Sequence, residues 1–166
     1  MRSNIESAQA EGTEVVPGAA ERVGAPETTG APEVTRLVLY FSNELGTKLV
    51  EETRDVTPTS ETASATVWAL IAGPAGPNRQ TIPRGTRLND IRIEKGTATI
   101  DLSREFVDGL PGGSLGERLA VYSIVNSLTE LSTIEEVEIL VSGRKVDAIG
   151  GHLDLSGALT REESLL

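Results

Sequence analysis

The amino-acid sequence predicts an α+β domain built as a two-layer sandwich, in which two helices pack on one face of a mixed β-sheet. Apolar residues repeat with a period that switches between that of strands and that of helices, in the order ββαββαβ. Only two segments have the helical period, and two helices cannot cover both faces of a sheet of this size. The helices are therefore expected on one face.

Three segments divide the chain: a disordered tether over residues 1–33, a folded domain over 34–160 and a C-terminal tail over 161–166. The first segment contains three prolines, four glycines and six acidic residues against two arginines, with almost no large apolar residue. Such a segment cannot compensate by burial for the conformational entropy that ordering removes. We therefore expect the packed core to begin after residue 33.

The domain is expected to open with two strands. Five consecutive apolar residues at 37–41 mix branched and aromatic side chains, which is typical of a buried strand. The segment TKLVEETRDV at 47–56 is more polar and is expected to be an edge strand or the second arm of a hairpin. Residues 43–47, which include Gly46, supply the turn between them.

A first helix is expected next, followed by a hairpin. Thr59 or Ser60 is the expected N-cap of the helix, and Gly73-Pro74 ends it. In LNDIRIEKGTATIDLS, alternating apolar residues predict two arms joined by a turn at Lys95-Gly96. The apolar residues of the helix are Ala63, Val67, Leu70 and Ile71, and those of the hairpin are Ile91, Ile93, Ala98, Ile100 and Leu102.

A second helix is expected from Ser114, which with Glu117 forms the S-x-x-E pattern of a capping box. Apolar residues then recur every three or four positions, which predicts an amphipathic core helix. VEILVSGRKVD at 137–147 is expected to be a strand and a turn, and LDLSGAL at 153–159 a short closing segment. The helical stripe consists of Leu115, Leu119, Tyr122, Val125, Leu128 and Leu131.

The same serine suggests an alternative function, that of a small serine hydrolase. Gly112, Ser114 and Gly116 match the G-x-S-x-G pattern of a nucleophile elbow, and Asp147 and His152 follow in the order of that triad. A nucleophile elbow requires a strand that runs directly into the serine, whereas here the loop REFVDGLPGG precedes it. The capping interpretation is therefore favoured, and no catalytic residue is expected.

Cofactor and metal sites are not expected either. The chain has no cysteine and a single histidine, His152, and it contains neither H-x-x-H nor H-E-x-x-H. Binding of cell-wall glycan, a second alternative, would require an aromatic platform around Trp68 or Tyr40. Both aromatic residues lie in apolar periodic segments and are therefore expected in the core.

Charge limits the choice of partner. Twenty-five acidic residues against fifteen basic ones give a net charge of −10, which disfavours binding of nucleic acid. Four arginines form a basic stretch that is a candidate contact with an anionic partner or with carboxylates of a neighbouring subunit. The alternative is a solvated loop face. These residues are Arg79, Arg84, Arg87 and Arg92.

No apolar run in the sequence reaches the roughly 18 residues that span a bilayer. The first ten residues, MRSNIESAQA, lack the hydrophobic core of a signal peptide. The protein is therefore expected to be either cytoplasmic or attached through an anchor that lies outside this chain.

Five segments follow one another in a recognisable order: LVLYFSN, ALIAGPAG, TIPRGTRLNDIRIEKGTATIDLSREF, ERLAVYSIVNSLTEL and VEILVSGRKV. They contain a helix that ends in Gly-Pro, an Ile-Pro-x-Gly-Thr segment, a hairpin that ends in Asp-Leu-Ser and the run Asn-Ser-Leu-Thr-Glu. Together, over residues 35–159, they resemble the GerM domain. That family is named after a spore-germination and sporulation lipoprotein.

The resemblance implies a non-enzymatic domain outside the cytoplasmic membrane, with a fold similar to the ring-building motifs of sporulation complexes, which associate side by side. The implied partners are envelope proteins or further copies of the chain, and the implied location is the outer face of the cytoplasmic membrane. In the family, a lipid-modified cysteine or a membrane helix precedes a flexible spacer. Residues 1–33 fit that spacer, whereas the chain has no such cysteine, so contact with the membrane is expected only through an anchor outside this chain.

Overall fold

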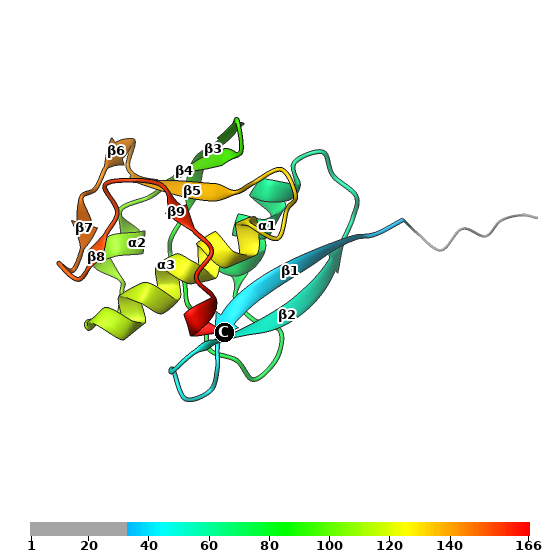
Figure 1. The fold of residues 1–166 in the computed structure, drawn as a ribbon. Coiled ribbons are helices and arrows are strands. Elements are labelled where there is room, and N and C mark those ends of the chain that lie inside the picture. Colours follow the sequence, from blue (N-terminus) through cyan, green and yellow to red (C-terminus); the bar gives the residue numbers. More distant parts are fainter. Residues whose placement is uncertain (1–32) are drawn as a thin grey trace, which may run out of the picture. The chain divides into compact units, whose positions relative to one another are not determined.

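The computed structural model describes residues 33–166, and its main elements follow the predicted order (Figure 1). Nearly all of the predicted tether, residues 1–32, lies outside the described residues. The main elements are β1 (Thr35–Ser42), β2 (Leu49–Val56), α1 (Thr62–Ala72), β3 (Leu88–Glu94), β4 (Thr97–Leu102), α3 (Ser114–Leu128) and β5 (Glu136–Val141). Shorter elements are α2 (Glu105–Asp108), β6 (Arg144–Lys145), β7 (Ala148–Ile149), β8 (Leu153–Asp154), β9 (Leu159–Thr160) and a 3₁₀ helix (Glu163–Leu165).

The larger sheet is mixed, as predicted. Its strand order is β3-β4-β5-β6, with β9 beside β5. β3 and β4 form an antiparallel hairpin, whereas β4 and β5 are parallel because the chain crosses between them through α2 and α3. The α+β class is thereby confirmed, and β3 is left as an edge strand of this sheet.

The hairpin β1–β2 forms a separate two-stranded sheet and does not join the larger one. Two hydroxyl groups of α3 occupy the second edge of β1: the Tyr40 N–H donates to Ser127 Oγ (2.9 Å), and Ser123 Oγ donates to the Tyr40 carbonyl (2.8 Å). Figure 1 shows α3 between this hairpin and the larger sheet. Because its edge is already paired with a helix, β1 cannot pair with another strand at this point.

Helix α3 is therefore buried on more sides than one apolar stripe predicts. Ten of its fifteen residues are buried, including Ser123 and Asn126, whereas Leu115 in the predicted stripe is 40% exposed. A helix that is covered on several faces belongs to the interior of a domain. Its position between β1 and the sheet explains why polar residues of α3 are buried and hydrogen-bonded.

The turn of the β3–β4 hairpin was predicted correctly. Lys95 and Gly96 have φ angles of 51° and 88°, as a type I′ turn requires at both central positions. Ser142 and Gly143, between β5 and β6, repeat this geometry with φ angles of 51° and 76°. Gly73 ends α1 with a φ of 92°, also as predicted.

Both predicted N-caps are wrong. Helix α1 has Glu61 as its N-cap. The Thr59 hydroxyl, two residues before this N-cap, accepts the Glu61 N–H and caps no residue inside the helix. Helix α3 has Gly113 as its N-cap and no side-chain capping bond, so Ser114 is only its first residue. The side chain of Glu117, predicted to close the capping box, is buried and meets His152 instead.

The last six residues, assigned to a tail from the sequence, pack against the domain. Arg161 donates to the Tyr40 hydroxyl (2.8 Å) and to Glu130 (2.6 Å), and Leu165 is 5% exposed in a cluster with Tyr40 and Leu49. Burial and the hydrogen bond to Glu130 raise the pKa of Tyr40. The C-terminal segment therefore forms part of the folded unit.

Replacing Glu52 with glutamine is expected to lower the free energy of unfolding by about 1–2 kcal/mol at pH 7. The Glu52 carboxylate accepts the N–H groups of Ala75 (2.9 Å) and Gly76 (3.4 Å) and pairs with Arg54 (3.0 Å). Burial acts to raise the pKa of Glu52, but these donors outweigh it and hold the pKa below its ordinary value. The Glu52 contribution is therefore present above the unfolded-state pKa and is lost as the pH falls through the folded-state pKa.

Urea unfolding of the wild type and of Glu52→Gln at several pH values between 7 and 3 measures this difference. It is expected to shrink as the solution becomes acidic. The exposed neighbour Glu51, replaced with glutamine, is the matched control and is expected to change stability by less than about 0.5 kcal/mol. A difference for Glu52→Gln that stays constant down to pH 3 would contradict the assignment.

Gly109→Ala is expected to destabilise the domain by about 1–3 kcal/mol through overpacking. A Cβ at this position would lie 2.6 Å from Pro83 Cβ and 3.0 Å from the Glu105 carbonyl oxygen, and neither the ring nor the backbone can move away freely. Gly112→Ala is the matched control, because a Cβ there meets nothing within 4 Å. Thermal unfolding of both variants tests the prediction, which fails if the two midpoints are equal.

Candidate functional site

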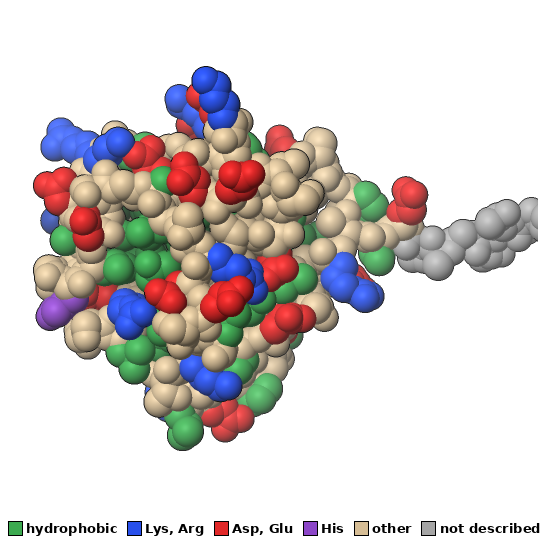
Figure 2. Space-filling view, viewed as in Figure 1, with side chains coloured by type: hydrophobic (Ala, Val, Ile, Leu, Met, Phe, Trp, Pro, Cys, Tyr) green, Lys and Arg blue, Asp and Glu red, His purple; other side chains and the backbone are tan. Residues whose placement is uncertain are grey.

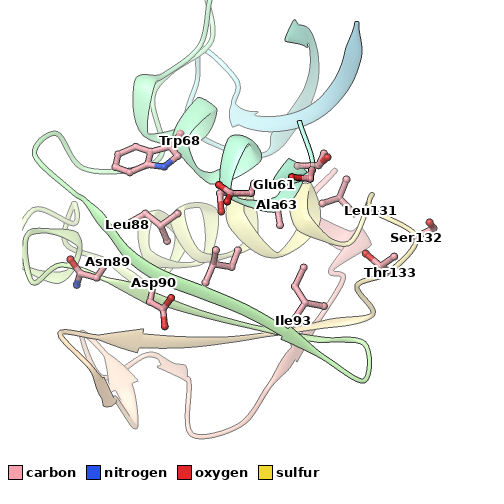
Figure 3. Close-up of a pocket in the computed structure, with 14 residues that line it drawn as sticks. Glu61, Ala63, Trp68, Leu88, Asn89, Asp90, Ile93, Leu131, Ser132 and Thr133 are labelled. Carbon is pink, nitrogen blue, oxygen red and sulfur yellow. The ribbon is translucent and has the colours of Figure 1, made fainter. Parts of the chain in front are cut away.

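A groove lies between α1 and the edge strand β3 (Figure 3). Its volume is about 790 Å³, and it is open to solvent along its length. The lining comes from the start of α1, from β3 and from the turn after α3. These residues are Ser60, Glu61, Thr62, Ala63, Ser64, Trp68, Leu88, Asn89, Asp90, Ile91, Ile93, Leu131, Ser132 and Thr133.

Trp68 lies on the wall that α1 contributes. The sequence prediction that Trp68 belongs to the core is wrong, since 49% of the residue is exposed, whereas Tyr40 is 5% exposed and was assigned correctly. The spacing did contain the signal: Trp68 follows Val67 directly and is therefore rotated by about 100° from the buried stripe of the helix. Figure 3 shows its ring above Leu88 of β3.

Aliphatic side chains form the floor of the groove. Leu88, Ile91 and Leu131 are half-buried, and Ile93 is 44% exposed. Ile91 and Ile93 alternate along β3 and so point to the same side of the sheet. Exposed apolar surface of this kind, next to a tryptophan, is a common feature of sites that bind another molecule.

Polar groups surround this apolar floor. Glu61 comes from the start of α1. Asp90 of β3 also borders the groove, but its side chain points to the opposite face of the sheet from Ile93, as Figure 3 shows, and pairs there with Arg92 at 2.8 Å. The lining contains these two acids and no lysine or arginine. Among these lining residues, the acidic side chain on the groove side is therefore that of Glu61.

Within residues 33–166, the three residues of the hydrolase alternative do not form a hydrogen-bonded triad. His152 Nδ1 lies 3.2 Å from Glu117 Oε2, so the imidazole faces Glu117 and not Asp147. Asp147 is exposed, and its carbonyl accepts the Leu155 N–H. Within residues 33–166, no hydrogen bond joins Ser114 to His152. The structure therefore brings one glutamate and the histidine together, and it does not assemble the triad of the hydrolase alternative.

The glycines beside His152 explain this contact. Gly150 has a φ of 59°, and a Cβ there would lie 1.8 Å from Glu117 Oε1, so the backbone of the β7–β8 turn rests on the carboxylate. The sequence contained no signal for this pairing, because residues 117 and 152 belong to elements far apart in the chain.

The four candidate arginines are all exposed, in two different settings. Arg87 pairs with Glu105 (3.4 Å) and Arg92 with Asp90 (2.8 Å), whereas the main chain of Arg79 pairs with Ser42 and Arg84 lies in the loop before β3. Acidic and basic side chains are interspersed on the face seen in Figure 2. A role of the four arginines in binding a partner remains a prediction.

Neither long helix within residues 33–166 combines the length and apolar character needed to cross a bilayer. Over the same residues, no three acidic or histidine side chains gather in a way that suits a metal ion.

A family described as "Germane: Sporulation and spore germination" matches residues 38–147. Among solved structures, the first GerMN domain of the sporulation protein GerM from Bacillus subtilis has a TM-score of 0.67 and 25% sequence identity, with 76% of this chain and 98% of that chain covered. The tandem GerMN domains of the same protein have a TM-score of 0.67 and 24% identity, over 77% of this chain and 46% of that chain. This chain thus spans about half of the tandem structure.

A third similar structure is that of a Clostridium perfringens protein described as a lipoprotein, with a TM-score of 0.56 and 26% identity over 76% of this chain and 87% of that chain. A search of curated proteins found no match.

Proposed function

Because this chain belongs to the Germane family of sporulation and spore-germination domains, we propose that it is a non-enzymatic extracytoplasmic module that binds envelope proteins or further copies of itself through the groove between α1 and β3. The observation that carries this proposal is the exposed apolar lining of the groove. A half-exposed tryptophan and a 44% exposed isoleucine face solvent next to an unpaired sheet edge. Tryptophan is enriched among the residues that contribute most to binding at protein interfaces.

The location outside the cytoplasmic membrane is supported by the relatives. One similar protein is described as a lipoprotein and another as a sporulation protein. We propose that this domain is likewise held at the outer face of the cytoplasmic membrane and contributes to sporulation or germination.

Trp68→Ala is expected to weaken partner binding strongly with little effect on folding, because half of the residue is already in solvent. A tryptophan at the centre of an interface commonly contributes 2 kcal/mol or more, which corresponds to a loss of affinity of about thirtyfold. Tagged wild type and variant are compared by capture from an envelope extract and by light scattering over a range of concentrations.

Leu45→Ala is the matched control. Leu45 is an apolar residue with 79% exposure at the β1–β2 turn and does not line the groove. The proposal predicts that Leu45→Ala retains a discrete captured protein, or a concentration-dependent oligomer, that Trp68→Ala loses. A wild type that is strictly monomeric and captures nothing would refute it, and so would a Trp68→Ala variant that behaves like the wild type.

The exposure of Trp68 also favours a second candidate, the binding of cell-wall glycan. Hydroxyl groups of Ser60, Thr62 and Ser64 lie on the same wall as the indole ring, and a few polar groups beside an apolar surface are typical of small-ligand sites. Sedimentation with insoluble cell-wall material distinguishes this candidate from protein binding. The aliphatic floor of the groove, with a single aromatic residue, makes protein the preferred partner.

A further inference from the structure

The main chain of β3 has unpaired groups on the side away from β4. Glu94 and Thr97 flank the two-residue turn and therefore form a hydrogen-bonded pair. Hydrogen-bonded and non-bonded pairs alternate in an antiparallel ladder, so Ile91 and Ile93 direct their N–H and C=O groups away from β4. Beyond the β3–β4 ladder, the described residues form no hydrogen bond to Ile91 or Ile93.

The side chains of the same two residues line the groove. A strand added beside β3 would pair with the free main-chain groups of Ile91 and Ile93. Every second side chain of that strand would then project over the groove, toward Trp68 and Leu131, because side chains alternate between the two faces of a sheet. Strand addition of this kind combines main-chain affinity with side-chain specificity.

Charge selects the occupant. On the groove side the lining contains Glu61 and no basic residue. On the opposite face β3 presents two acids, Asp90 and Glu94, against one base, Arg92, and the exposed Asp90–Arg92 ion pair contributes little to stability. Residues 1–33 carry six acids against two arginines. The other open strand, β2, reads LVEETRDV, with three acids against one arginine. Both segments of this chain therefore carry the wrong sign for the groove.

From these observations we infer that β3 receives, as an added strand, an extended segment of a partner protein in which apolar residues alternate with lysine or arginine. This inference rests on the proposed function, since it names the class of partner that the same groove binds. The apolar residues occupy the groove beside Trp68, and the cationic residues, which point to the opposite face of the sheet, lie near Asp90 and Glu94.

The test uses a fluorescein-labelled peptide of eight alternating valine and lysine residues, with fluorescence anisotropy as the readout. Three matched probes separate the contributions: alternating valine and glutamate, alternating serine and lysine, and the valine–lysine peptide with alternate amides N-methylated on its pairing edge. Only the unmodified valine–lysine peptide is expected to bind. The N-methylated peptide retains every side chain but cannot pair with the strand edge.

Two protein variants are compared with the Leu45→Ala control. Trp68→Ala is expected to weaken binding at least tenfold. Ile93→Pro removes one free N–H on the open side of β3, a position where proline is tolerated in an edge strand, and is expected to abolish binding. Hydrogen exchange provides a measurement that needs no variant: the amides of Ile91 and Ile93 are expected to become protected when the peptide is added.

Equal binding of the N-methylated peptide, or unchanged exchange at Ile91 and Ile93, would overturn strand addition. If no peptide binds while Trp68→Ala still loses its envelope partner, the inference fails and the proposed function stands. If wild type and Trp68→Ala capture the same proteins, the proposed function fails, and the inference fails with it.

Discussion

Phe106→Ala is expected to lower the free energy of unfolding by about 3–5 kcal/mol, the largest effect of any single substitution considered for this domain. Phe106 is 0% exposed and belongs to the main hydrophobic cluster. It lies on α2, a helix of four residues. An isolated helix of this length is not stable in water, so burial of the phenylalanine ring is what holds α2 in place.

Urea unfolding followed by circular dichroism measures this change. Phe106→Leu, which keeps an apolar side chain in the same site, is the control. Its free energy of unfolding is expected to fall by less than half of the decrease in Phe106→Ala. A loss below about 1 kcal/mol for Phe106→Ala would show that the site is not part of the core.

Ser123→Ala is expected to lower the free energy of unfolding by about 2–4 kcal/mol, because it leaves two buried polar groups without partners. A serine hydroxyl has one hydrogen, and Ser123 donates it to the Tyr40 carbonyl at 2.8 Å. The Thr81 hydroxyl, 2.7 Å away, must then donate to Ser123 Oγ. Ser123 is 0% exposed, Tyr40 5% and Thr81 7%, so water cannot replace the lost bonds without a rearrangement.

Two controls make the result specific. Adding Thr81→Val to Ser123→Ala removes one of the two unpaired groups and is expected to restore part of the lost stability. Ser114→Ala removes an exposed serine of the same helix that makes no capping bond, and it is expected to change stability by less than about 0.5 kcal/mol. If Ser123→Ala lowered the free energy of unfolding no more than Ser114→Ala does, the Ser123 hydroxyl would not be what holds β1 to α3.

The hairpin β3–β4 illustrates what local chemistry decides. A lysine followed by a glycine, between two runs of alternating apolar residues, predicted the turn, its residues and the two arms. All the interactions that define this hairpin join residues close in the chain. The end of α1 at Gly73 was predictable for the same reason.

The N-terminus of α3 illustrates the opposite case. Ser114 and Glu117 have the spacing of a capping box, yet Glu117 turns away from the helix end and contacts His152, thirty-five positions later. The buried Glu117 side chain lies beside the imidazole, and the helix start has no side-chain capping bond. This contact depends on the position of the β7–β8 turn, which the local sequence around Ser114 does not specify.

The candidate site was predictable in its parts and not as a whole. Ile91, Ile93 and Trp68 were recognised as apolar residues of regular elements, and their spacing placed the isoleucines on one side of a strand. That side was not known to be open, because its exposure depends on how α1 is placed relative to β3.

By itself, the sequence determined the α+β class, the order of the main strands and helices, the turn residues and the family to which the chain belongs. These features depend on periodicity and on bonds between near neighbours. Only the tertiary structure decided that β1 pairs with the hydroxyls of α3, that Trp68 faces solvent and that β3 keeps an open edge. Each of these depends on packing between elements distant in the chain, where burial and the pairing of polar groups override local preference.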